Sequence, residues 1–218
     1  MCDSNCCRLT MCGLVCLIAF SGIIAMIAVT TQPDKCYAGG VTDLLNSSAS
    51  PVSYVLKQSY SNNRKFSVTE TGDVFRQGYY KQWRYKWFTP DGEVVMYMKQ
   101  KVISFGSEYN SDGCDSIAPK WRFDEKIWSF DKEFKIYHND IQVAKSEKSK
   151  WRCNADVRIY DMSDVLVATL HRNCLNLLRT NWEITNNRRD IVPNYALSFL
   201  AVITTSEEES KKKKSSNS

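Results

Sequence analysis

The chain has 218 residues, nine cysteines and a net charge of +5. This length suffices for one domain with a sizeable core, and no change of composition between residues 50 and 204 indicates a second domain. The small positive charge argues against the strongly basic surface of nucleic-acid-binding proteins, so we expect no nucleic-acid partner.

The cysteine-rich residues 1–10 precede an uncharged apolar stretch at residues 11–31. This stretch is long enough to span a bilayer, and its apolar core is longer than that of a cleaved signal peptide. We therefore predict a retained single-pass transmembrane anchor. Cysteines beside an anchor are typical cytosolic S-acylation (palmitoylation) sites, and the candidates are Cys2, Cys6, Cys7 and Cys12. Cys12 lies inside the stretch, where a small apolar side chain can equally serve as helix packing.

Residues 32–50 are Ser-rich, and we interpret them as a linker between the membrane and the domain. The linker holds the sequon Asn46-Ser47-Ser48, a candidate N-glycosylation site. Four cysteines after the anchor have three possible pairings and no CxxC spacing, and the disulfide candidates are Cys36, Cys114, Cys153 and Cys174. The sequon and the even number of cysteines favour a lumenal or extracellular domain.

From residue 51 onward, short β-rich segments alternate with turn residues, and the repeated unit is a hairpin. We predict four hairpins, at residues 65–80, 84–100, 133–149 and 156–173, and a further strand at 181–185. The predicted turns are Gly72, Asp91-Gly92, Asn139-Asp140 and Ser163-Asp164. Alternate positions in the strands are apolar, which is the pattern of a sheet with one solvent-facing side.

Residues 193–205 form a final apolar run that is too short to cross a bilayer. Its apolar residues point all round a helix, so such a helix must be covered on every side. Repeated antiparallel hairpins must curl or close to avoid open edges. We therefore predict a mainly β domain at residues 51–205, a closed antiparallel β-barrel around this hydrophobic C-terminal helix. The charged residues 206–218 predict a disordered tail.

Four segments in this region carry a resemblance to a known family: VMYMKQKVISFGSEYN, FKIYHND, VRIYDMSDVLVATLHRNCLNLLRTNWEIT and NYALSFLAVIT. Together they resemble the tubby carboxy-terminal-like superfamily, closest to its LURP-one-related branch and more distantly to the phospholipid scramblases. The resemblance rests on the hairpin order and the terminal helix, and it implies about twelve strands. For function it implies phosphoinositide binding, lipid scrambling or a role in defence. It also implies a cytosolic placement, in contrast to the sequon and the cysteines.

The sequence contains few candidate catalytic residues. His138 and His171 are the two histidines, and each lies at a predicted turn or strand end, where capping or surface roles are typical. The acidic pair Asp124-Glu125 lies in an aromatic segment that favours a strand and turn over an acid–base pair. No nucleophile, phosphate-loop or metal motif is present in the sequence. We predict no enzyme, no cofactor and no metal site.

Basic residues interleave with tryptophans along the predicted strands. Strand alternation would place the bases on the solvent-facing side and the rings inside. The candidates for a headgroup-binding surface are Lys81, Arg84, Lys86, Lys120, Arg122, Lys150 and Arg152. The sequence thus predicts a membrane-anchored, non-enzymatic module that binds anionic phospholipid or a protein partner. The alternatives are a scramblase-like lipid transporter and a structural cell-surface protein.

Overall fold

The structure is a computed structural model that describes residues 35–37, 52–59, 64–78, 85–103, 106–114, 119–126, 133–148, 155–172 and 180–216. The chain divides into two compact units, Met1–Lys35 and Cys36–Ser218, and the second unit holds the fold. Within the described ranges, no helix is both long and apolar enough to cross a membrane. The anchor predicted at residues 11–31 and most of the linker predicted at 32–50 lie outside these ranges.

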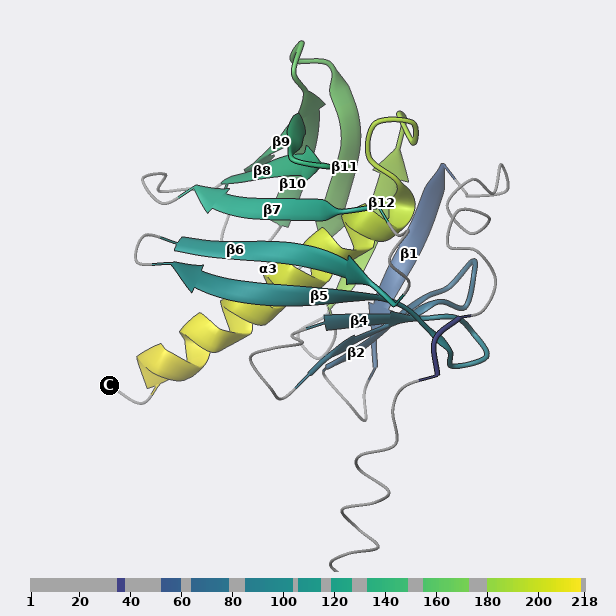
Figure 1. Cartoon of the computed structure of the whole chain (residues 1–218). Coiled ribbons are helices and arrows are strands. Elements are labelled where there is room, and N and C mark those ends of the chain that lie inside the picture. The colour runs from purple at the N-terminus through teal and green to yellow at the C-terminus, as the bar shows by residue number, and fades with distance from the viewer. Residues whose placement is uncertain are drawn as a thin grey trace, which may run out of the picture. The chain divides into compact units, whose positions relative to one another are not determined.

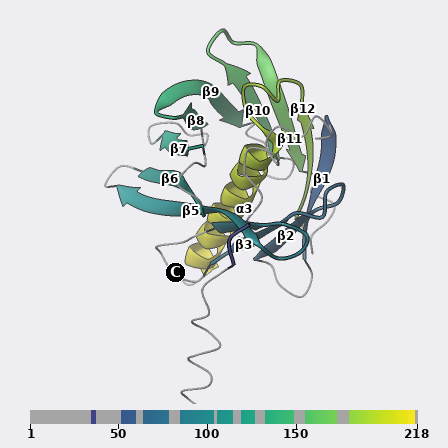
Figure 2. The ribbon, with the colours of Figure 1, turned by 45° about the vertical axis from the view of Figure 1, so that its right-hand side comes forward.

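Twelve antiparallel strands close into a barrel, which confirms the predicted closed antiparallel barrel (Figures 1 and 2). Each strand pairs with its neighbours in the chain, and β1 pairs with β12 to complete the circle. The strands are β1 Ser53–Gln58, β2 Lys65–Val68, β3 Val74–Gln77, β4 Tyr85–Phe88, β5 Val94–Ile103, β6 Gly106–Gly113, β7 Trp121–Lys126, β8 Glu133–His138, β9 Ile141–Lys148, β10 Ala155–Asp161, β11 Leu166–Arg172 and β12 Asn181–Asn186.

The four predicted hairpins are present, and their turns have the backbone conformation that the sequence indicates. The positive φ angles are 76° at Gly72, 87° at Gly92, 48° at Asn139, 66° at Asp140 and 61° at Asp164. Asn139 and Asp140 alone connect β8 to β9, and two consecutive positive φ angles match the right-handed twist of the flanking strands. The turn chemistry therefore sets the register of the hairpins.

Strand alternation separates the wall of the barrel into an apolar interior and a polar exterior. Phe66, Ile136 and Ile159 point inward and are buried. Trp87 and Trp121 are also interior, with 3% of each residue exposed, whereas the adjacent basic residues lie outside. This confirms that rings and bases occupy opposite faces of β4 and β7. Trp83, Trp128 and Trp151, the other tryptophans near the candidate basic residues, lie outside the described residues.

Helix α3, Asn194–Ser216, runs through the barrel (Figure 2). Its residues 196–203 are at most 1% exposed because the barrel interior covers every side of them. The Phe199 ring meets Phe75 edge-on at 5.0 Å, and the Tyr195 ring stacks on Trp87 at 5.0 Å. The predicted central helix is therefore present, and it fills space that the wall residues alone would leave empty.

The start of α3 is held by neutral hydrogen bonds. The Tyr54 hydroxyl donates to the Asn194 carbonyl at 2.7 Å, and Trp121 Nε1 donates to the Tyr195 hydroxyl at 2.7 Å. Burial raises the pKa of both tyrosines, although hydrogen bonds from Ser198 and Trp121 oppose the shift. Both hydroxyls therefore remain protonated donors at any physiological pH.

The predicted disordered tail is wrong for most of its length, because α3 continues to Ser216. Three consecutive glutamates extend from the helix to three different strands: Glu207 bonds to Tyr109 on β6, Glu208 to Arg172 on β11 at 2.5 Å, and Glu209 to Gln58 on β1 at 3.0 Å. Consecutive helical residues point about 100° apart, so each reaches a different part of the wall. These contacts hold residues 207–209 of the helix against the barrel wall.

The sequence beyond these glutamates also favours helix. Lys211, Lys212 and Lys213 each follow a glutamate by four positions. A glutamate four residues before a lysine stabilises a helix, and basic residues are favoured near its C-terminal end. Charge composition alone suggested a disordered tail, whereas the spacing of the charges is typical of a helix.

Candidate anion-binding surface

The structure describes three of the predicted headgroup residues, and it places them in two separate parts of the wall. Lys86 lies on β4, Lys120 immediately before β7, and Arg122 on β7. Strands β5 and β6 lie between, and at about 4.8 Å per strand the two groups are roughly 14 Å apart. The remaining candidates, Lys81, Arg84, Lys150 and Arg152, lie outside the described residues.

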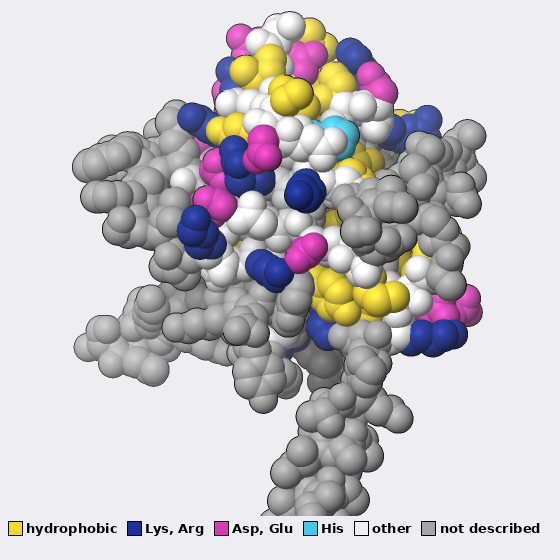
Figure 3. Space-filling model, in the orientation of Figure 1, with side chains coloured by type: hydrophobic (Ala, Val, Ile, Leu, Met, Phe, Trp, Pro, Cys, Tyr) yellow, Lys and Arg dark blue, Asp and Glu magenta, His cyan; other side chains and the backbone are white. Residues whose placement is uncertain are grey.

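Arg122 belongs to a group of four side chains, the Arg122 cluster, in which two carboxylates surround one guanidinium: Arg122, Asp124, Tyr137 and Asp140. The guanidinium lies 2.7 Å from Asp140, 3.3 Å from Asp124, and 4.1 Å from the centre of the Tyr137 ring. Desolvation alone would lower the pKa of Arg122, but the two carboxylates and Tyr137 outweigh it and raise that pKa. Figure 3 shows basic and acidic side chains interspersed over β5 to β8. Arg122 is therefore already matched by negative charge.

A second group, the basic row, consists of Lys65, Arg76 and Lys86. Strand register places Lys65 on β2 directly opposite Arg76 on β3, and Arg76 opposite Lys86 on β4. Directly opposed residues share one face of a sheet, so three like charges lie side by side on the outer wall. In the part of the chain that the structure describes, no carboxylate forms an ion pair with Lys65 or Arg76. Like charges in this arrangement destabilise a sheet unless an anion compensates them.

Aromatic rings support two members of the basic row. The Arg76 guanidinium carbon lies 4.8 Å from the centre of the Phe88 ring, and the Lys86 Nζ lies 5.4 Å from that of Tyr97. Such contacts hold a cation in place without neutralising it. Arg76 is exposed to solvent, so its N–H donors can form the bidentate bonds that phosphate accepts.

The carboxylates near this wall already have other partners. These are Asp112 with Lys99 Nζ at 2.8 Å, Glu70 with the Val55 amide at 3.0 Å, and Asp73 with the Thr71 hydroxyl at 2.7 Å. Burial raises the pKa of Asp73, although hydrogen bonds from Thr71 and Trp87 oppose the shift. No basic residue is among the causes of this shift. Among the described residues, these acids therefore leave Lys65 and Arg76 without a carboxylate partner.

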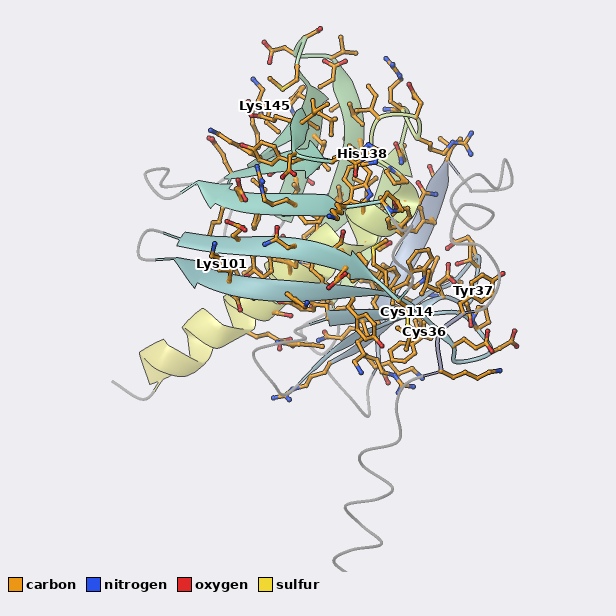
Figure 4. The ribbon with its side chains drawn as sticks, in the orientation of Figure 1. Cys36, Tyr37, Lys101, Cys114, His138 and Lys145 are labelled. Carbon is orange, nitrogen blue, oxygen red and sulfur yellow. A yellow bond between two sulfur atoms is a disulfide. The ribbon has the colours of Figure 1, made fainter. Side chains whose placement is uncertain are left out.

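A disulfide lies beside the same wall. Cys36 is bonded to Cys114, with 5.6 Å between their Cα atoms, and the Cys114 Sγ lies 3.7 Å from the Tyr97 hydroxyl. Cys36 also bridges to Val94 at the start of β5, where the Tyr37 amide donates to the Val94 carbonyl at 2.9 Å. Figure 4 shows both cysteines at this place, and Figure 3 shows hydrophobic side chains around it. The chain therefore joins the barrel next to the aromatic residue that supports Lys86.

The observed Cys36–Cys114 disulfide thus belongs to one of the three possible pairings of the four candidate cysteines. The other two candidate cysteines, Cys153 and Cys174, lie outside the described residues, as do Asn46 and the acylation candidates Cys2, Cys6, Cys7 and Cys12. Those sites stay predictions.

The sequence prediction missed Lys65 and Arg76, because it selected bases that alternate with tryptophans. The signal was present in the hairpin itself. Gly72 sets the turn between β2 and β3, and this turn places Lys65 and Arg76 opposite each other. Counting outward from the turn would have identified the pair.

The histidines have structural partners. The His138 ring stacks on Trp121 at 4.6 Å between centres. His171 Nδ1 lies 2.5 Å from Asp156 Oδ1, and its other cross-strand neighbour is Glu183, a second carboxylate. Among the described residues, no three metal-ligating side chains come together.

Comparison of the chain with protein-family models, curated proteins and solved structures finds no match.

Proposed function

We propose that this protein is a membrane-anchored, tubby-like barrel that binds anionic phospholipid headgroups through the basic row and has no enzymatic activity. One observation carries the proposal: the basic row, in which Lys65 and Arg76 have no carboxylate partner among the described residues, and the point where the chain joins the barrel lie on the same wall. Tyr97 connects the two, since it supports Lys86 through its ring and contacts Cys114 through its hydroxyl.

The length of the connecting segment supports a position close to the bilayer. Only residues 32–35 separate the predicted span at 11–31 from Cys36, which is bonded to the barrel. At about 3.5 Å per extended residue, these residues reach no more than roughly 18 Å. A barrel on so short a tether remains within reach of the headgroups.

The chemistry of the basic row suits phosphate. Arg76 offers a planar fork of N–H donors, and two lysines flank it as point charges. Each basic residue near an anionic membrane contributes about 1 kcal/mol to binding. Lys65 and Arg76, which have no carboxylate partner among the described residues, together favour an anionic surface over a neutral one by roughly 2 kcal/mol, or about thirtyfold.

This surface favours binding over the predicted scramblase activity. Scrambling requires a polar path through the hydrocarbon, whereas the basic row lies on the wall of a barrel outside the predicted span. The disulfide supports the lumenal or extracellular placement that we propose, because disulfides persist in oxidising compartments. A gel shift after N-glycosidase treatment, abolished by Asn46→Gln, would test that placement.

Lysine footprinting on the full-length protein tests headgroup binding. The protein is reconstituted in nanodiscs of phosphatidylcholine alone or with about one fifth phosphatidylserine, and an amine-acylating reagent is followed by mass spectrometry. We expect Lys65 and Lys86 to be acylated more slowly on the anionic discs, whereas Lys145, far from the disulfide in Figure 4, reacts equally on both. Equal acylation of Lys65 and Lys86 on the two kinds of disc would refute headgroup binding.

A further inference from the structure

We propose that two copies of this chain associate through an apolar surface at the tips of two neighbouring hairpins. This surface, the hairpin patch, consists of Ile141 at the start of β9 and of Met162, Val165 and Leu166 around the turn between β10 and β11. The inference goes beyond headgroup binding and is independent of it, because the hairpin patch shares no residue with the basic row.

The hairpin patch holds four of the five large hydrophobic residues that are exposed in the described part of the chain; the fifth is Val52, ahead of β1. Ile141 is 70% exposed and Met162 is 59% exposed. Figure 3 shows hydrophobic side chains over these hairpins, at the top of the view, with acidic and basic side chains beside them. A cluster of exposed apolar side chains, unlike a single one, is typical of an interaction surface.

Strand pairing brings the two tips together. Asp161 on β10 lies opposite Ala144 on β9, so both turns project from the same end of neighbouring strands. The Lys145 Nζ on β9 lies 2.6 Å from Asp164 in the other turn, which links the two hairpins. Asp161 Oδ1 also accepts a hydrogen bond from the Val165 amide at 2.9 Å, within the β10–β11 turn. The surface is therefore held in place before any partner binds, which reduces the entropy cost of association.

The acids beside the hairpin patch argue against a membrane as its partner. Asp140 precedes Ile141, and Asp164 lies between Met162 and Val165. The two carboxylate side chains are 80% and 75% exposed, so insertion of either tip would carry a carboxylate into the bilayer. An anionic leaflet repels such an acid, and hydrocarbon does not solvate it. A protein surface can instead supply a base.

The same charges suit a second copy of this chain. Lys145 and Asp164 both reach solvent, as do Arg188 and Asp190 in the loop before α3, which pair at 3.0 Å. In a two-fold contact both copies use the same surface, so the base of each copy can meet the acid of the other. A uniformly basic or acidic partner would be repelled by one member of each pair. The hairpin patch is therefore self-complementary in charge as well as apolar.

Site-specific photo-crosslinking tests this contact. Ser163, in the β10–β11 turn, is replaced by benzoylphenylalanine in the full-length protein, which is reconstituted in phosphatidylcholine nanodiscs large enough for two copies. The control carries the crosslinker at Lys101, an exposed residue of β5 that Figure 4 shows apart from Lys145. We expect the Ser163 variant to crosslink to residues 139–141 or 162–166 of a second copy, as identified by mass spectrometry, and the Lys101 variant to form no such dimer.

Three results of this experiment would overturn the proposal: a crosslink from position 163 to phospholipid in place of a second copy, a crosslink to another part of the second copy, or no crosslinked dimer. None of them bears on headgroup binding, because the discs contain no anionic lipid.

Ile141→Ser measures the apolar contribution in the same assay. A two-fold contact loses this side chain from both copies, so we expect at least about tenfold less dimer. Val52→Ser is the matched control, an exposed aliphatic residue outside the hairpin patch, and it should leave the dimer unchanged. Equal losses in the two variants would overturn the assignment of the contact to the hairpin patch.

A charge exchange tests whether the partner is a second copy in a two-fold contact. Asp164→Lys makes the Lys145–Asp164 pair wholly positive, and Lys145→Asp makes it wholly negative, so each variant alone should form about tenfold less crosslinked dimer than the wild type. An equal mixture of the two variants should recover the wild-type amount, because their surfaces then attract each other. A mixture that crosslinks no better than either variant alone would overturn the two-fold contact.

Discussion

Arg76 and Arg122 occupy similar positions in different parts of the wall. Each projects outward from a strand, and each guanidinium lies over an aromatic ring, at 4.8 Å from Phe88 and 4.1 Å from Tyr137. They differ in their neighbours, because Arg122 pairs with two carboxylates whereas Arg76 lies between two lysines. Cross-strand register, rather than residue type or aromatic context, therefore determines which basic residue is available to bind an anion.

Reversing the charge of Arg76 should have the largest effect. Arg76→Glu removes one positive charge and adds a negative one, and at about 1 kcal/mol per charge the preference for anionic discs decreases roughly thirtyfold. Footprinting of Lys65 and Lys86 measures this effect directly, since arginine does not react with the reagent. Unchanged protection of both lysines in the folded variant would show that the basic row does not contact the headgroups.

Neutralising each arginine in turn compares the contributions of Arg76 and Arg122 to binding. Arg76→Gln should reduce the preference for anionic discs about fivefold, the equivalent of about 1 kcal/mol. Arg122→Gln should change it less than twofold, because Asp124 and Asp140 already balance that charge. The two variants are compared in the same footprinting assay. Equal losses would mean that the carboxylates do not shield Arg122, and the distinction between the two regions would fail.

Removing the ring under Arg76 should have a smaller effect. In Phe88→Leu the guanidinium loses a cation–π contact of about 0.5–1 kcal/mol, so we expect a two- to fivefold weaker preference for anionic discs. Tyr137→Leu is the matched control in the Arg122 cluster, where the same loss should leave footprinting unchanged. A drop of equal size in both variants would indicate a general loss of barrel stability, which urea unfolding of each variant would detect.

The barrel itself was predictable because its local signals agree. Gly72, Gly92 and Asn139-Asp140 mark tight turns, and strict alternation on either side sets the inward faces. The apolar run at residues 193–205 required a covering wall, and a closed barrel supplies it. Residues 206–216 were predicted wrongly, because the contacts of Glu207 and Glu208 with Tyr109 and Arg172 are long-range and leave no local pattern.

The candidate site was less predictable than the fold. Lys86 was identified by its neighbouring tryptophan, but its partners Lys65 and Arg76 lie on other strands, and only pairing register brings the three together. Arg122 had the same sequence signature as Lys86. Its carboxylate Asp140 comes from the turn between β8 and β9, so only the folded barrel shows that its charge is balanced.

The smallest expected effect concerns Asp73 and Asp124, the acids in the same two regions as Arg76 and Arg122. Burial is the largest cause of the raised pKa of both Asp73 and Asp124, but Arg122 opposes the shift of Asp124, whereas only hydrogen bonds oppose that of Asp73. A carboxyl whose pKa is higher in the folded state stabilises the fold fully below its unfolded pKa, and this contribution is lost as pH rises through the folded pKa. In Asp73→Asn this pH dependence is absent. The free energy of unfolding of the wild-type protein should therefore decrease relative to that of Asp73→Asn as pH rises from about 3.5 towards neutrality, as measured by urea titration at several pH values. If the difference stayed constant with pH, Asp73 would titrate alike in both states, and burial in the folded protein would not raise its pKa.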